Sequence, residues 1–490
     1  MHKTYIHIAL TLLLGCLLPL HSTPRLTVVV LVDGLRTDNL TMMQPYWQAG
    51  GLRTLTEHAH RTSVILEQEV YGGAETVATL LTGETPAIHG IPADSYFSRA
   101  DRNIHPVLED ENETGIGCQR KISPRRLLVP SLTDKFRITY GEKARVFAIG
   151  QDPETTIIMA GHSADGCCWW DGQTRQWATT SFYKKGLPAA ADEANISGRI
   201  EETTAGEWQP RMDIRMYVNP TAQETKSGFS YKLDKHLERS PWINKLTIEL
   251  ALAMQKKEQL GEDSTPDMLL IQLTSRSPKS TGDKICSAEQ EDMYLALNQD
   301  IGFLMEQLDK RIGESNMQIV VMGVPRLGMS KESMEKTGMP VHSFNVDRAA
   351  ALTGAYLMAI YGHERWVDGG FGQSIFLNRL LIEQKKMPIE TIRQQVADFL
   401  LDFEGVRVAH TLHEAYSDDR LARSMNKLSA GDVVFMLQPG WQLTFGDNTI
   451  IDNVIDERAD IPVFIMSGKH NTLPDKQITP QEFIYLITKN

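Results

Sequence analysis

Short runs of β-branched and aliphatic residues, spaced along the chain, constrain its fold more than any other feature. The first, RLTVVVLVDGL at 25–35, ends in Asp-Gly, as a buried parallel strand does at its carboxyl edge. Comparable runs are ARVFAIG at 144–150, PDMLLIQLT at 266–274 and MQIVVMGV at 317–324. Helical patterns lie between them, at 76–83, 243–260 and 291–312. The alternation predicts an α/β fold with a mostly parallel central sheet covered on both faces, and catalytic groups at the carboxyl ends of its strands.

Length and charge limit the function further. With 490 residues, 41% of them hydrophobic, the chain can bury a large core. Its net charge of −12 offers no basic face for a nucleic-acid backbone, so we expect no nucleic-acid partner. The polar stretch from about 172 to 240 lacks the strand and helix rhythm and is predicted to be a cap inserted into one domain spanning 24–490.

The start of the chain resembles an export signal. Lys3 precedes the apolar run IHIALTLLLGCLLPL, which has the length of a secretory h-region and is short for a bilayer span. We therefore predict a signal peptide over 1–22 and a periplasmic or secreted protein with no other transmembrane segment. The stretch Leu13 to Cys16 also resembles a lipobox, which leaves a lipoprotein anchored through Cys16 as the alternative.

The remaining cysteines are too sparse for a disulfide scaffold. They are Cys118, Cys167, Cys168 and Cys286. No CxxC pair or histidine at ligand spacing accompanies them, so we expect small buried residues, with at most one disulfide.

Seven stretches occur in an order that resembles a known superfamily. They are VDGLRTD at 32–38, TGETPAIHGI at 82–91, SPRRL at 123–127, AGHSADGCCWWD at 160–171, EDMYLALNQD at 291–300, FNVDRAAALTGAYLMAIYG at 344–362 and SAGDVVFMLQPGW at 429–441. Together they resemble the alkaline phosphatase superfamily, in the group of type I phosphodiesterases, nucleotide pyrophosphatases and secreted threonine-nucleophile alkaline phosphatases. The resemblance covers about 27 to 468 and implies a three-layer α/β/α fold. It also implies two zinc ions, a hydroxyl nucleophile on a helix N-terminus, and an Asn and a Lys/Arg pair that hold phosphate.

The resemblance places residues without the required chemistry at the nucleophile and phosphate positions. Gly73 stands at the nucleophile position and has no attacking atom. Thr76 is the nearby hydroxyl, but three residues of helix displace it by about 4.5 Å, so capping or solvent exposure is the expected role. Asp94 replaces the Asn, and Asp152 and Glu154 replace the basic pair.

The implied metal ligands are mostly absent as well. Asp33 is retained, whereas the other positions read Ser277, Thr281, Val324, Pro325 and Asp460. We therefore expect no zinc cofactor. A divalent metal remains the alternative, with Asp33 as the only plausible surviving ligand and Asp460 as a weak second ligand for Ca²⁺ or Mg²⁺.

The other candidate residues favour structural roles. His89 and His162 lie inside retained motifs and are expected to be packed or hydrogen-bonded. His410 and His413 have the i, i+3 spacing of one helix face, and a surface helix is their expected setting. The pair Trp169 and Trp170 is a candidate partner contact, with core packing as the favoured role.

Together these features predict an exported pseudo-enzyme with a binding or structural role in the cell envelope. Its partner would be an envelope protein or a glycan. The alternative is an active phosphate-ester hydrolase, a phosphomonoesterase or phosphodiesterase, with a relocated site. That site would combine Thr76, Asp33, Asp94 and Asp460 with a hard cation.

Overall fold

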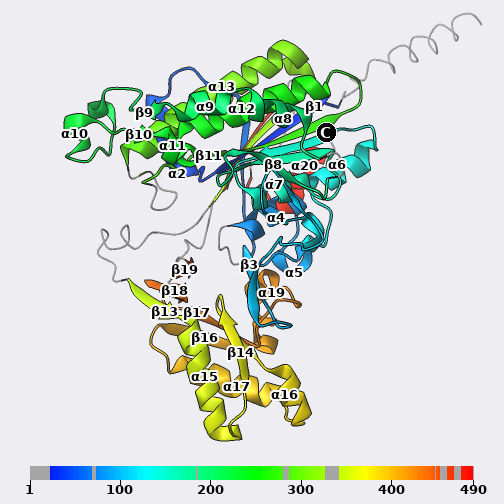
Figure 1. Cartoon of the computed structure of the whole chain (residues 1–490), viewed down its shortest axis with the longest axis vertical. Coiled ribbons are helices and arrows are strands. Elements are labelled where there is room, and N and C mark those ends of the chain that lie inside the picture. Colours follow the sequence, from blue (N-terminus) through cyan, green and yellow to red (C-terminus); the bar gives the residue numbers. More distant parts are fainter. Residues whose placement is uncertain are drawn as a thin grey trace, which may run out of the picture.

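A nine-stranded mixed sheet forms the body of the protein in a computed structural model (Figure 1). The structure describes residues 23–68, 73–183, 186–279, 285, 287–325, 341–446, 449–452, 461–467 and 476–488. Cys16, Thr281, Cys286 and Asp460 lie outside these ranges, as does the predicted signal peptide. Among the described helices, none combines the length and apolarity needed to cross a bilayer.

The sheet has a parallel centre and antiparallel edges. Its order is β2-β20-β12-β1-β11-β6-β7-β8-β5. The parallel strands are β12 (Met317–Val324), β1 (Leu26–Asp33), β11 (Asp267–Thr274), β6 (Val146–Gly150) and β7 (Gly166–Asp171). The edge strands are β2 (His60–Val64), β20 (Ile461–Ser467), β8 (Gln176–Thr180) and β5 (Gly115–Ile116). Four of the central strands are the runs predicted from the sequence, which confirms the α/β fold class.

Helices cover both faces of the sheet and bury its centre. Every residue of β1 is buried, and its side chains alternate between two apolar cores. Val28 and Val30 belong to the core on one face, and Val29 and Leu31 to the core on the other. The first core includes α3 (Gly51–His58), α8 (Ala189–Ile196), α12 (Pro241–Glu258) and α13 (Ala288–Ile312). The second includes α4 (Ala74–Thr82), α6 (Leu132–Tyr140), α7 (Pro153–Ala160) and α20 (Pro480–Thr488).

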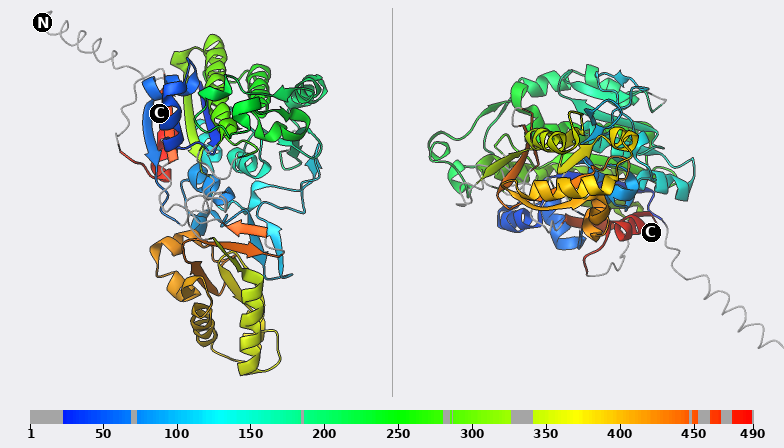
Figure 2. Two further views of the ribbon diagram at one scale, coloured as in Figure 1. Left: turned by 90° about the vertical axis from the view of Figure 1, so that its left-hand side faces the viewer. Right: turned by 90° about the horizontal axis from the view of Figure 1, so that it is seen from below.

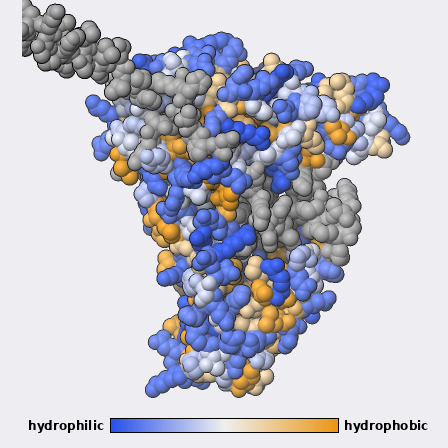
Figure 3. Space-filling view, turned by 180° about the vertical axis from the view of Figure 1, so that it is seen from behind, coloured by the Kyte–Doolittle hydropathy of each residue, from blue (hydrophilic) through white to orange (hydrophobic). Residues whose placement is uncertain are grey.

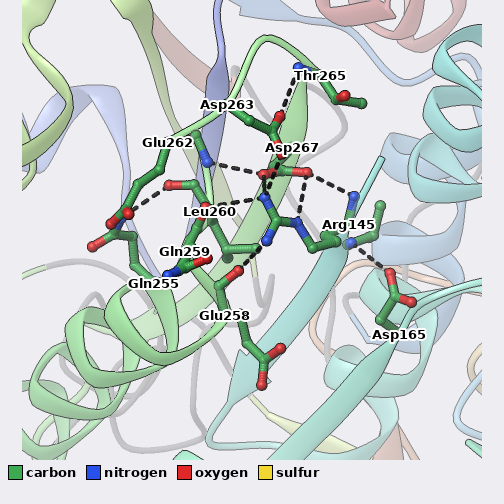
Figure 4. Close-up of polar contacts among 12 residues, drawn as sticks. Arg145, Asp165, Gln255, Glu258, Gln259, Leu260, Glu262, Asp263, Thr265 and Asp267 are labelled. Carbon is green, nitrogen blue, oxygen red and sulfur yellow. Dashed lines mark hydrogen bonds and ion pairs between the residues drawn. The ribbon is translucent and has the colours of Figure 1, made fainter. Parts of the chain in front are cut away.

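An arginine and an aspartate join the amino ends of two central strands (Figure 4). Arg145, just before β6, donates from its backbone nitrogen and its Nη2 to the carboxylate of Asp267, at 2.7 and 2.9 Å. The same carboxylate accepts a hydrogen bond from the backbone of Gly261 at 2.9 Å. Arg145 Nη2 also donates to the carbonyl of Gln259, at 3.0 Å, in the turn after α12. This ion pair, in which the carboxylate is buried and the arginine is partly exposed, fixes the edge of the sheet opposite to the candidate site.

Residues 341–446 form a second, smaller unit, whereas the sequence predicts a single domain. Its sheet has the order β14-β15-β17-β16 and an apolar core of its own (Figures 1 and 2). The strands are β14 (Val367–Phe371), β15 (Ser374–Leu377), β17 (Val433–Leu437) and β16 (Val406–Thr411), and the main helices are α15 (Val346–Tyr361), α16 (Arg379–Gln384) and α17 (Ile389–Leu401). A three-stranded sheet of β13 (His342–Asn345), β18 (Trp441–Phe445) and β19 (Thr449–Asp452) adjoins it. The hairpin β3 (Ser95–Ser98) and β4 (Asn103–Pro106) reaches this unit from the body (Figure 1).

The segment predicted as a cap divides between the sheet and the helical layer. Its first strand, β8, pairs with β7, and α8 packs on α12. Further on, Trp208 in β9 (Glu207–Trp208) is buried and donates a hydrogen bond to Asp292 of α13 at 2.8 Å. Its role as a cap over the candidate site stays a prediction.

Hydrophilic side chains cover most of the face in Figure 3, where apolar residues form small, separate groups.

Candidate active site

The carboxyl edge of the sheet brings several predicted positions together. Asp33 is the last residue of β1, and its register partners are Thr274 on β11 and Val324 on β12. Ser277 follows β11 by three residues, and Pro325 follows Val324 directly. The side chains of Ser277, Val324 and Pro325 are all buried. Parallel strands end at the same edge, so these positions share one region, as the resemblance implies.

An arginine side chain lies beside Asp33, the carboxylate that the resemblance implies as a metal ligand. Nη1 of Arg276 lies 4.0 Å from Oδ2 of Asp33. The described residues contain no group of three or more His, Cys, Asp or Glu side chains that could hold a metal ion. Apolar Val324 and Pro325 offer no donor atoms. The described side chains at this edge therefore do not fit a zinc pair.

The position that the resemblance assigns to the nucleophile has a backbone conformation that requires glycine. Gly73 is the N-cap of α4, with φ 155° and ψ −148°. This region of the backbone map is essentially restricted to glycine. Oδ1 of Asp94 accepts a hydrogen bond from the backbone nitrogen of Ala74 at 2.7 Å. A Cβ atom on residue 73 would lie only 2.5 Å from that same oxygen. The carboxylate of Asp94 thus occupies the helix N-terminus, where the partial positive charge favours an anion.

Thr76 is neither a cap nor exposed, so the expectation for it was wrong. Its side chain is fully buried, and its hydroxyl donates to Oε1 of Glu75 at 3.0 Å. Every residue of α4 is buried, because α7 and α20 pack against it. Thr76 therefore faces the interior, and Asp94 is the residue that bonds to the start of the helix.

Asp152 and Glu154, at the positions where the resemblance implies a basic pair, make local structural contacts. Asp152 is the N-cap of α7 and accepts a hydrogen bond from the backbone of Thr155 at 2.8 Å. Glu154 forms an ion pair with Arg120. Oε1 of Gln272 accepts from the backbone nitrogens of residues 151 and 152, at 3.0 and 2.9 Å. Gln272 is not among the residues predicted from the sequence, although a polar residue inside the apolar run of β11 is a visible signal.

The histidines of the retained motifs are held by hydrogen bonds. His89 is fully buried, its Nδ1 accepts from the backbone of Ile91 at 3.1 Å, and its Nε2 lies 3.0 Å from Oγ1 of Thr79. Burial lowers its pKa to about 3, so the ring is neutral. Nδ1 of His162 lies 3.0 Å from Oδ2 of Asp134, and the bond to this carboxylate raises the histidine's pKa. Both residues have the structural setting expected for them.

The second histidine pair does not share a helix, which corrects the expectation. His410 lies on strand β16, opposite Val434, and His413 lies in the short helix α18 (Leu412–Ala415). The helix begins only at residue 412, because Thr411 caps it by accepting from the backbone of Glu414. His410 therefore belongs to a strand and His413 to a helix, so the two imidazole rings do not share one helix face.

The aromatic and cysteine motifs are core elements. Trp169 and Trp170 lie on β7 and are 0% and 3% exposed, so they cannot serve as a surface contact. Cys167 and Cys168 are buried and free, and Cys118 is free and half-buried. Burial raises the pKa of both buried thiols.

The layered sheet, with its parallel centre and helices on both faces, defines a class of protein, an alkaline phosphatase-like fold. The crystal structure of wild-type alkaline phosphatase PafA superimposes with a TM-score of 0.83 over 95% of this chain and 96% of that chain, at 21% identity. The family model for type I phosphodiesterase / nucleotide pyrophosphatase matches residues 27–458, and the chain belongs to this family.

Curated relatives agree with this assignment. Alkaline phosphatase PafA of Elizabethkingia meningoseptica is 23% identical over 453 residues, 85% of this chain and 82% of the relative. Alkaline phosphatase PhoV of Synechococcus elongatus is 23% identical over 458 residues, 87% of this chain and 82% of the relative.

Proposed function

We propose that this protein is a pseudo-enzyme of its family, without metal-dependent hydrolysis of phosphate esters. One observation carries the proposal: Asp94 accepts the backbone hydrogen bond of Ala74 at the position where the family places a nucleophile and a phosphate. Gly73 supplies no attacking atom there. A carboxylate at this place would repel a phosphate dianion, whereas the amide of an Asn would donate a hydrogen bond to it.

The size of the expected effect supports the proposal. Loss of one electrostatic stabiliser costs about 3 to 4 kcal/mol, or a factor of about 10² to 10³ in rate. Here the nucleophile and the basic pair are both replaced, and Arg276 lies beside the remaining carboxylate ligand. Such losses are not additive, but the reaction lacks its attacking group altogether.

Metal content and hydrolysis test this proposal together. We would measure zinc, calcium and magnesium in the purified full chain, and its turnover of 4-nitrophenyl phosphate and bis(4-nitrophenyl) phosphate. We expect no stoichiometric metal and the same background rate in the protein and in Asp33→Ala. Two zinc ions per chain would contradict the proposal. Metal-dependent turnover that Asp33→Ala abolishes would instead support a hydrolase with a relocated site built from Asp33, Thr76, Asp94 and Asp460.

We also propose that the protein is exported and acts in the cell envelope by binding a protein or a glycan. The apolar run that precedes Ser22 and the relatives named as alkaline phosphatases support this proposal. Mass spectrometry of the mature chain from fractionated cells tests it. We expect a chain that begins near residue 23 outside the cytoplasm. A lipid on Cys16, absent in Cys16→Ser, would show anchoring instead. A full-length chain in the cytoplasm would contradict export.

The binding role needs its own experiment. Photo-crosslinking of the full chain in intact cells should yield an adduct with an envelope protein or a glycan, and competition with unlabelled protein should reduce it. Only random, non-competed adducts would contradict a specific partner.

A further inference from the structure

A cavity of about 580 Å³ lies between the body and the second unit, beside the hairpin β3–β4. Its walls come from the hairpin, from residues 108–110 and 112, from the turn η2 (Pro124–Arg126) and from residues 426 and 428. The volume falls in the range of small-molecule sites. Its lining carries three arginines and two carboxylates, together with leucine and aromatic side chains.

Arg126 differs from the other two arginines in this wall. Arg99 is paired with Asp432 at 2.8 Å, and Arg125 forms ion pairs with Asp110 and Glu113. No carboxylate among the described residues pairs with Arg126, and its buried Nε has no hydrogen-bond partner there. A buried donor without a partner is costly, so this side chain has hydrogen-bonding capacity that the described residues do not use.

The guanidinium of Arg126 is nevertheless held in place. Its Cζ lies 3.5 Å from the centre of the Tyr96 ring, which is the geometry of a cation–π contact. The turn that carries it is fixed from both sides. Oγ of Ser123 donates to Asp110 at 2.6 Å, and the backbone of Leu128 donates to the carbonyl of His89 at 3.0 Å. A planar, oriented donor with no internal counter-ion is suited to a carboxylate or phosphate group.

The apolar part of the cavity lies next to this charge. Leu108 is buried in its wall, whereas Leu128 and Leu428 are 55% and 78% exposed. Exposed leucines grouped around a cavity offer surface that a ligand could cover. Contact with Tyr96 and with these leucines would favour an apolar body over a bare inorganic anion.

We propose that this cavity binds a small organic anion, whose carboxylate or phosphate group pairs with Arg126 and whose apolar body contacts Tyr96 and the leucines. The proposal rests on Arg126 and its surroundings, and it holds whether or not the family's reaction is retained. The lining residues do not include Gly73 or Asp94 of the candidate active site.

Calorimetric titration of the full chain tests the proposal with three probes: 1-naphthoate, neutral 1-naphthol and inorganic phosphate. We expect 1-naphthoate to bind with a Kd below about 1 mM, at least about tenfold more tightly than either other probe. Arg126→Gln should weaken this binding at least about tenfold. Tyr96→Leu should weaken it too, whereas Tyr96→Phe keeps the ring and should bind nearly as the native chain does.

Matched controls separate the site from the fold. Arg53→Gln changes an exposed arginine on α3 and should leave binding unchanged. Thermal unfolding of each variant shows whether it is folded. The proposal is overturned by no binding of 1-naphthoate, by equal binding of 1-naphthol, or by unchanged binding in folded Arg126→Gln. Binding of an acidic peptide through Arg126, with no naphthoate binding, would assign the surface to a protein partner and also overturn it.

Discussion

Residues 73 and 94 are joined by one contact, so the side chains that these two positions can carry depend on each other. The carboxylate of Asp94 lies where a side chain on residue 73 would begin, and it bonds to the helix that such a side chain would start. A hydroxyl at residue 73 therefore requires both a different backbone and a different position of Asp94. Each residue was identified from the sequence alone, but their contact was not, because it depends on how a distant loop packs on α4.

Gly73→Ala should destabilise the protein by about 1 to 3 kcal/mol, because the backbone there is essentially restricted to glycine and the Cβ meets Asp94. In the Asp94→Ala background the steric part disappears, so the same change should cost less. Denaturant unfolding of the four proteins measures this coupling. Gly141→Ala is the control, since φ there is 83° but no atom lies within 4 Å of the added Cβ. Strictly additive losses at residues 73 and 94 would contradict the contact.

The neutral ring of His89 makes stability depend on pH. Its pKa is about 3 in the folded protein and about 6.5 when unfolded, so the unfolded chain binds the proton first. Stability is therefore fully present above about pH 6.5 and falls as the pH decreases toward 3, by about 1.4 kcal/mol per unit from this group. Unfolding at several pH values between 7 and 4.5 should show a shallower slope for His89→Gln than for the native protein. Equal slopes would contradict this assignment.

At the scale of elements, the sequence predicts the buried parallel strands well and the antiparallel ones poorly. Strands β1, β6, β11 and β12 are continuous apolar runs, because helices cover both of their sides. Strand β2 reads HRTSV, and β16 reads VRVAHT, so neither has such a run. Their formation depends on partners elsewhere, such as Ile465 opposite His60. This is also why His410 was assigned to a helix and the second sheet was missed.

Arg145→Ala should destabilise the protein by about 3 to 5 kcal/mol, because it leaves the fully buried carboxylate of Asp267 without its cation at the start of β11. Denaturant unfolding measures the loss. Arg311→Ala is the matched control: Arg311 pairs with Glu262 at 2.7 Å nearby, but both side chains are about one-third exposed, so the cost should be about 0 to 1 kcal/mol. Similar losses in the two variants would show that the ion pair at Asp267 contributes no more to the free energy of unfolding than the exposed pair does.

At the scale of the whole molecule, the hairpin β3–β4 links two separately packed parts. The body has its cores on the two faces of the large sheet, and the second unit has its own. Phe97 of the hairpin packs on Phe376 of the second sheet, with ring centres 4.4 Å apart. Arg99 reaches the buried carboxylate of Asp432 on that unit. The same hairpin follows Asp94 and contributes Tyr96 to the anion cavity, so both proposed features depend on how the two parts are joined.

Arg99→Ala should loosen the second unit without unfolding the body. Asp432 keeps its pairs with Arg379 and Arg393, so we expect a local loss of about 2 kcal/mol, or about 30-fold faster hydrogen exchange in β15 and β17. Exchange in β1 and β11 should not change, because their cores do not include this pair. Arg102→Ala is the control in the same hairpin: its pair with Asp368 is 2.7 Å long, but Arg102 is 40% exposed, so little change is expected. If exchange in β1 became faster by the same factor, the two parts would unfold together. Only then would the loss of the Arg99 ion pair increase hydrogen exchange at the centre of the large sheet.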